Sequence, residues 1–170
     1  MEFSLDTLEQ HIVAVRDPRV AVLLEDLARD YEQRYGEGGI TEMSSYPDEQ
    51  FEAPDGKFVI LQHAGQTVAG GAYRKYDEQT AELKRIWTHP DYRRRGLGIK
   101  LLEVLEDEAA GHGYRKLFLV TGPMQPEAIA MYARHGYEPL FDMSADLAQL
   151  HELAFAKPLP QAAATGSVQP

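Results

Sequence analysis

Apolar residues recur at helical spacing near the start of the chain. They are Val20, Leu23, Leu24, Leu27 and Tyr31. This three-to-four-residue period predicts an amphipathic helix. Asp17 followed by Pro18 supplies an N-cap and a proline for the first turn, and Gly36 predicts the end of the helix. The weakly alternating residues 11–17 predict a first strand just before it.

Three apolar runs separated by short turns follow in the next third of the chain. Residues 57–63 and 67–76 flank the sequence AGQ, which predicts a hairpin, and DEQT leads into a third run at 81–89. We therefore expect three consecutive antiparallel strands. Residues 36–56 mix Gly, Ser, Pro and acidic residues and predict a long loop or irregular helix. A segment of this length often lines a substrate site, and the alternative is a poorly ordered segment.

The clearest helical pattern covers residues 97–113. Its buried stripe is predicted to consist of Leu101, Leu102, Leu105 and Ala109. The opposite face, expected in water, carries Glu103, Glu106, Asp107 and Glu108. Gly111 or Gly113 supplies the left-handed position at which such a helix ends.

The last third of the chain predicts a strand, a short helix and two closing strands. Residues 115–122 are almost continuously apolar, as in a strand buried on both faces. A helix is expected to open at Pro126 and stop at Gly136, before strands near 137–141 and 151–159. The tail 160–170 has little to bury, so we expect it to be disordered.

This order of elements predicts an α/β (α+β) fold with a mixed sheet in a single domain over residues 1–159. The strand–helix–strand unit through 81–121 should be a right-handed crossover whose two strands are parallel. Ligands of such sheets bind beyond the carboxyl ends of the strands.

Composition narrows the function. The 170 residues carry a formal net charge of −10, which disfavours a duplex nucleic-acid partner and suits a cationic acceptor. The absence of cysteine excludes disulfides, cysteine nucleophiles and thiolate metal sites in this chain. No apolar run reaches eighteen residues, and the N-terminus is acidic. We therefore expect a cytoplasmic protein without a membrane partner.

One basic and glycine-rich stretch stands out between the third strand and the long helix. Arg93, Arg94 and Arg95 run into Gly96 and Gly98. Free N–H groups at a helix N-terminus, a close backbone approach at glycine and forked guanidinium donors together suit a pyrophosphate. The alternative is a solvated basic turn capped by glycine. The phosphate loop G-x-x-x-x-G-K-[ST] is absent, and Leu101 replaces the third glycine of a dinucleotide fingerprint.

The pattern that fits is R/Q-x-x-G-x-G/A, met by Arg93, Gly96 and Gly98. With it the chain resembles the GNAT superfamily of N-acetyltransferases. Residues 81–98 and 113–139 resemble the family's fourth strand, pyrophosphate loop, next strand, helix and Gly-aromatic turn, and the match holds register over about 57–140. The resemblance implies a mostly antiparallel sheet of six to seven strands with a splayed central parallel pair, flanked by about four helices.

The resemblance also implies acetyl-CoA as cofactor. Backbone N–H groups of 94–99 would hold its pyrophosphate, and the pantetheine arm would lie between 86–88 and 119–121 by main-chain hydrogen bonds. The residues assigned to the cofactor in this way are Ile86, Trp87, Thr88, Arg93, Arg94, Arg95, Gly96, Leu97, Gly98, Ile99 and Gln125. Gln125 stands where the family often has Asn, and the Trp87 side chain is expected in the core.

Two residues are candidates for the chemistry. Glu82 stands fourteen positions before Gly96, which is the offset of the base glutamate in histone-acetylating members of the superfamily. An amine of pKa about 10.4 matches a carboxylate poorly, so a water relay is plausible, and an ion pair with Lys84 or Arg85 is the structural alternative. Tyr132 stands where the family carries a general-acid tyrosine, and a phenol stays protonated at neutral pH. Its alternative is ordinary helix packing.

We therefore expect an N-acetyltransferase that joins acetyl-CoA and a primary amine, of a small molecule or a protein, in a ternary complex with direct attack. A backbone N–H of Trp87 or Thr88 would stabilise the developing oxyanion. The alternatives are a non-catalytic acyl-CoA-binding regulatory module and, less favoured, a nucleotide-binding module. The six histidines lack a metal-binding spacing on one helix, so no metal is expected. The acceptor and the oligomeric state stay open, although a homodimer would be common in the family.

Overall fold

The computed structural model describes residues 2–36 and 47–160. The elements in chain order are η1 (Leu5–Thr7), β1 (Glu9–Val13), η2 (Pro18–Val20), α1 (Ala21–Tyr35), η3 (Asp48–Phe51), β2 (Lys57–His63), β3 (Gln66–Lys75), β4 (Thr80–Thr88), η4 (Pro90–Tyr92), α3 (Leu97–Gly111), β5 (Lys116–Thr121), α4 (Pro126–Arg134), β6 (Glu138–Pro139), η5 (Leu147–Gln149) and β7 (Leu153–Pro158). The seven strands form one sheet in the order β1-β2-β3-β4-β5-β7-β6.

Most of the predicted elements are confirmed. The strand at 57–63 agrees to the residue, and the strands at 67–76 and 81–89 each lie one residue earlier. The sheet is mixed and mostly antiparallel, with β4 and β5 as its parallel pair. In the described ranges there are three α-helices, where about four were expected. The predicted disordered tail falls outside the described residues after 160, as does loop segment 37–46.

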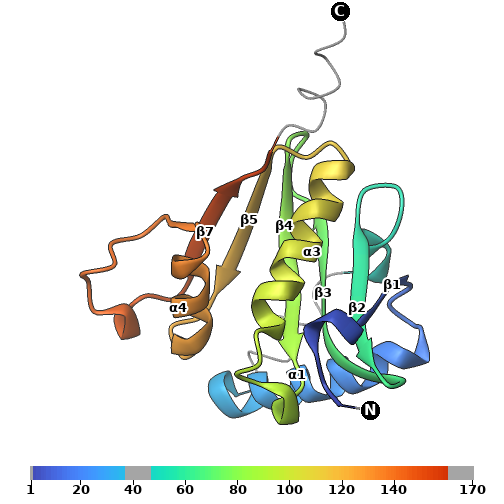
Figure 1. Ribbon diagram of the computed structural model, residues 1–170. Helices are drawn as coiled ribbons and strands as arrows, with labels where there is room; N and C mark the ends of the chain where they lie inside the picture. The colour runs from blue at the N-terminus through green and yellow to red at the C-terminus, as the bar shows by residue number, and fades with distance from the viewer. Residues whose placement is uncertain (1, 37–46, 161–170) are drawn as a thin grey trace, which may run out of the picture. The chain divides into compact units, whose positions relative to one another are not determined.

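The described chain forms two compact units. Unit 1 comprises residues 2–36, 47–74 and 84–105, and unit 2 comprises residues 75–83 and 106–160. In unit 1, β1, β2 and β3 are antiparallel neighbours, with Glu9 opposite Gln62 and Lys57 opposite Tyr73 (Figure 1). The first strand begins and ends earlier than the predicted 11–17, because the chain already turns where Asp17 N–H donates to Ala14 O.

Helix α1 begins three residues later than predicted, at Ala21, because Pro18–Val20 form the 3-10 turn η2 ahead of it. The Asp17 side chain caps the preceding η2 by accepting from the Arg19 N–H at 2.9 Å. Gly36, at φ 69°, ends the helix. The apolar face of α1 packs into a core that contains Val13, Val15, Val20, Leu23, Leu27, Phe51, Phe58, Ile60, Ala72 and Trp87.

Two adjacent glycines in β3 show how closely both faces of this sheet are covered. A Cβ on Gly70 would lie 2.5 Å from Leu23 Cδ1 of α1. A Cβ on Gly71 would lie 2.6 Å from Ile86 Cδ1 and 3.3 Å from Leu105 Cδ1 of α3. Successive strand residues point to opposite faces, so α1 and the first half of α3 cover opposite faces of unit 1.

In unit 2 the first residues of β4 pair in parallel with β5, from Thr80 opposite Lys116 to Glu82 opposite Phe118. This confirms the predicted parallel pair. Strand β5 then pairs antiparallel with β7, and β6 pairs with β7 (Figure 1). The expectation that β5 is buried on both faces is wrong, because only Leu117 and Leu119 are buried, whereas Phe118, Val120 and Thr121 are partly exposed.

Helix α3 has its predicted buried stripe, and Leu101, Leu102, Leu105 and Ala109 are all buried. Its acidic face is only partly as predicted. Glu103 is exposed, but the side chain of Glu106 is only 14% exposed and contacts two other residues of unit 2. Gly113, at φ 103°, is the left-handed residue after the helix.

Candidate active site

The turn before α3 presents backbone N–H groups at the start of a fifteen-residue helix. The first helical hydrogen bond runs from Lys100 N–H to Gly96 O at 3.1 Å, so the amides of Leu97, Gly98 and Ile99 lie ahead of the intrahelical ladder. Arg94 and Gly96 have left-handed backbones, with φ 63° and 81°. Alternating left-handed residues turn successive N–H groups toward a common concave side.

The three arginines of this turn are exposed, whereas Leu97 is buried and anchors the helix. The positive end of the helix and the guanidiniums add to the same field. These features fit a diphosphate, because its oxygens need N–H donors and a close backbone approach. The predicted cofactor residues 93–99 thus form one continuous structure in unit 1.

The N-terminal segment packs against this turn, a contact that the sequence pattern does not predict. The Arg95 guanidinium lies over the rings of Phe3 and Tyr92, 5.3 and 5.1 Å from their centroids. A Cβ on Gly96 would lie 3.4 Å from Leu5 Cδ1. Cation–π contacts of this kind fix the direction of a guanidinium, so Arg95 is held while it stays exposed.

The second half of β4 supplies the other predicted cofactor residues of unit 1. The Trp87 side chain is 4% exposed, belongs to the core and donates from Nε1 to Asp26 at 2.7 Å. Its predicted core role is confirmed. The backbone just before Ile86 is irregular, because Arg85 has φ 59° inside the strand. Main-chain binding by Ile86, Trp87 and Thr88 stays a prediction.

Unit 2 contains the two candidate catalytic residues. Glu82 is 4% exposed and lies in β4 opposite Phe118 of β5. Across residues 2–36 and 47–160, it is the one carboxylate side chain that the fold buries to this degree. Burial of a carboxylate costs free energy that ordinary packing does not require. Interaction partners of the carboxylate offset this cost, so the catalytic role of Glu82 stays a prediction beside the structural alternative of an ion pair.

Tyr132 lies near the end of α4 and is 5% exposed. The rings of Tyr137 and Phe155 each lie 5.6 Å from its ring, the first edge-on at 63° and the second tilted at 47°. Aromatic neighbours at these distances restrict the ring. The packing role that the sequence left open is therefore present, and the general-acid role stays a prediction beside it.

Gln125 joins the end of β5 to the start of α4. Its Oε1 accepts from the Thr121 hydroxyl at 3.1 Å and from the Gly122 N–H at 3.2 Å. These two contacts fix the amide at the carboxyl end of β5, where the topology places ligand sites. Contact between Gln125 and the cofactor stays a prediction.

A partly buried polar network lies beside the helix that carries Tyr132. Tyr137 donates to Glu106 Oε2 at 2.8 Å, and Lys157 Nζ donates to Glu106 Oε1 at 3.0 Å. Burial raises the pKa of the Tyr137 hydroxyl, and the Glu106 carboxylate raises it further. The sequence pattern does not predict this network, and its only local signal is a carboxylate next to the apolar stripe of a helix.

Comparison with a protein-family model decides to which family the chain belongs. The model of the acetyltransferase (GNAT) family matches residues 21–137. The chain belongs to the GNAT acetyltransferase family. This match covers the turn before α3, both candidate catalytic residues and Gln125.

Individual relatives are similar over about half of the chain. An IAA acetyltransferase of Azospirillum brasilense is 36% identical over 85 residues, which are 49% of this chain and 56% of that protein. An amino-acid acetyltransferase of Salmonella typhi is 34% identical over 93 residues, 54% of this chain and 20% of that protein. The matches thus span about half and one fifth of these relatives.

Solved structures share the fold over nearly the whole chain. A GNAT family acetyltransferase from Elizabethkingia anophelis, with acetyl-CoA bound, has a TM-score of 0.63 and 15% identity, and the match covers 91% of this chain and 99% of that one.

Within residues 2–36 and 47–160, no helix has the length and apolarity to cross a bilayer, and no group of three acidic or imidazole side chains is placed to hold a metal.

Proposed function

We propose that the chain is an N-acetyltransferase that moves the acetyl group of acetyl-CoA to a primary amine of a small molecule or protein. The observation that carries the proposal is the turn at 93–99, where two left-handed residues and the start of α3 present donors to a diphosphate. The acetyl thioester supplies an activated carbonyl carbon and a thiol leaving group. Main-chain groups of Ile86, Trp87 and Thr88, together with Gln125, would position the rest of the cofactor.

The catalytic roles belong to two residues of unit 2. Glu82 takes a proton from the acceptor amine, directly or through a water molecule, so that the nitrogen lone pair can form the new C–N bond. The C–S bond breaks as the amide forms, and the hydroxyl of Tyr132 gives its proton to the departing sulfur. A backbone N–H of Trp87 or Thr88 stabilises the carbonyl oxygen.

Two measurements test this function. Acetyl-CoA should raise the melting temperature of the chain while ATP and NAD do not, since a ligand at a hundred times its Kd stabilises by about 2.7 kcal/mol. Thiol release from acetyl-CoA in the presence of a panel of primary amines then separates an enzyme from an acyl-CoA-binding regulator. Binding of acetyl-CoA without release of its thiol in the presence of any amine would favour the regulator.

A cytoplasmic location is also part of the proposal, and cell fractionation tests it.

A further inference from the structure

Two arginines from neighbouring strands of unit 1 are held by consecutive residues of η3. Arg74 of β3 donates from Nε to Gln50 Oε1 at 2.6 Å. Arg85 of β4 places its guanidinium carbon 4.6 Å from the centre of the Phe51 ring. Because Gln50 and Phe51 are adjacent, the same turn of chain orients both cations. Neither arginine was singled out for a function by its sequence pattern.

The backbone of Arg85 is unusual for its position. It has φ 59° in the interior of a strand, a conformation that residues with a Cβ adopt at an energetic cost. Strained residues of this kind concentrate at functional sites, where the surrounding structure holds them in place. The strain accompanies the placement of the side chain over Phe51. Arg85 also stands three residues after Glu82 in the sequence.

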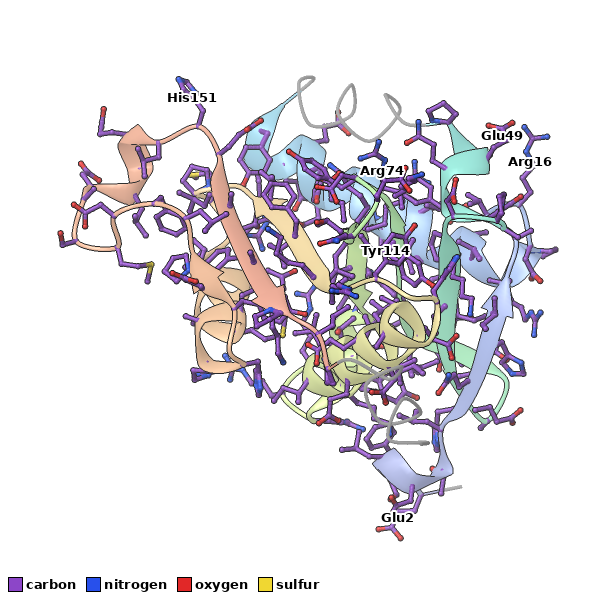
Figure 2. The ribbon with its side chains drawn as sticks, turned by 90° about the horizontal axis from the view of Figure 1, so that it is seen from above. Glu2, Arg16, Glu49, Arg74, Tyr114 and His151 are labelled. Carbon is purple, nitrogen blue, oxygen red and sulfur yellow. The ribbon has the colours of Figure 1, made fainter. Side chains whose placement is uncertain are left out.

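The surroundings hold Arg85 as a partly desolvated cation. Its side chain is partly buried, and this burial lowers the pKa of the guanidinium, while Asp48 and Tyr31 pull the pKa in the opposite direction. Asp48 also accepts from Nε of Arg16 at 3.3 Å, and the side chain of Arg16 is 87% exposed. Figure 2 shows Arg16 together with Glu49 at the outer edge of this unit, apart from Arg74.

We propose that Arg85, supported by Arg74, binds a carboxylate of the acetyl acceptor. The acceptor is then a small amine that carries a carboxylate, such as an amino acid, and this inference rests on the proposed function. A planar guanidinium offers a fork of donors that matches the two oxygens of a carboxylate. A chain with a net charge of −10 does not attract anions at long range, so a local pair of oriented arginines is needed to select one.

The test compares acceptors that differ only in the carboxylate. Each of the standard amino acids is paired with its C-terminal amide, and acetyl-CoA-dependent thiol release gives kcat/KM for both. The native chain should prefer the acid of its best pair by roughly 10- to 100-fold, the range of a hydrogen-bonded ionic contact. Arg85→Gln should reduce this preference to near unity by raising KM for the acid. Arg85→Lys keeps the positive charge but loses the forked pair of N–H donors, so its acid-to-amide ratio of kcat/KM should lie between those of the native chain and Arg85→Gln.

Arg134→Gln is the matched control, because it removes one positive charge from an exposed position on α4 and should leave the acid-to-amide ratio unchanged. Equal use of acid and amide by the native chain, or an unchanged ratio in Arg85→Gln, would overturn the proposal. An equal rise in melting temperature with acetyl-CoA for Arg85→Gln and the native chain would show that the variant is folded and binds cofactor.

A second readout does not depend on turnover. The Nε–H signals of Arg74 and Arg85 can be followed by NMR during titration with the N-acetylated amino acids and, separately, with their amides, in the presence of coenzyme A. Shifts caused by the acids and not by the amides would support the carboxylate site even if no amine reacted, an outcome that would count against the proposed function alone. The absence of shifts with every acid would overturn the carboxylate site.

Discussion

The hydroxyl of Tyr137 donates a hydrogen bond to Glu106 at 2.8 Å, which links the segment after α4 to the second half of α3. Lys157 of β7 donates to the other oxygen of the same carboxylate, and its ammonium lies 5.3 Å from the centre of the Tyr137 ring. The Tyr137 ring also makes an edge-on contact with the ring of Tyr132. The network therefore connects the packing of unit 2 to the candidate general acid.

Tyr137→Phe should lower the free energy of unfolding by about 1.5–3 kcal/mol, because it removes a hydrogen bond to a charged group. The pKa of Tyr137 is raised in the folded chain, so in the native protein unfolding should also become easier above pH about 10, where the unfolded tyrosine ionises. The variant should lose this part of the alkaline destabilisation. Urea denaturation at pH 7 and pH 10.5 measures both effects, and identical curves for the two proteins would contradict them.

Gly98→Trp should abolish binding of acetyl-CoA, because an indole at the second helical position would fill the approach to the amides of α3. Isothermal titration calorimetry measures the loss. Gly111→Trp is the control at the other end of the same helix, where a Cβ would meet no atom within 4 Å. Native affinity in Gly98→Trp would remove the turn from the cofactor site.

Tyr132→Phe should lower kcat by roughly 10²- to 10⁴-fold, the usual contribution of a positioned acid, while the affinity for acetyl-CoA changes little. The ring is retained, so its packing on Tyr137 and Phe155 is kept. Steady-state kinetics and calorimetry separate the two effects. The matched control is Tyr114→Phe, another buried tyrosine of unit 2. An unchanged kcat at every pH would leave Tyr132 with a packing role only.

Glu82→Gln should erase or shift the rise of kcat/KM with pH, because the amide cannot accept a proton from the acceptor amine. The side chain keeps its size, so the parallel pairing of β4 and β5 beside it should survive. The pH profile of thiol release, measured with one fixed amine, is the deciding experiment. A variant with the native profile would make Glu82 a structural residue.

The local pattern of apolar and polar residues was sufficient to predict most helices and strands. It did not predict the burial of side chains whose partners lie far along the chain. The strand 57–63 and the start of α3 at Leu97 follow from periodicity and glycine, which are properties of neighbouring residues. Glu106 was expected in water, but its partners lie 31 and 51 residues further along the chain. No periodicity within α3 indicates which of its polar residues those partners will cover.

The candidate site also contains features that the local sequence predicts and features that depend on distant residues. The turn at 93–99 could be predicted because a short motif determines its own geometry, including the left-handed Gly96. The left-handed backbone of Arg85 could not, since a non-glycine residue gives no signal of positive φ and the orienting contact comes from Phe51. The only sign in the sequence that Arg74 and Arg85 could have a special role was their position as charged residues in strands with many apolar residues.

The contacts of Phe3 and Leu5 with the turn before α3 bear on how this protein should be handled. An affinity tag or reporter fused ahead of Phe3 would add chain beside Arg95 and would compete for the space in front of the helix amides. Binding constants and stoichiometries obtained from such a fusion would describe the added segment as well as the chain itself. Purification handles are better attached after β7, and any handle in front should be cleaved before titration.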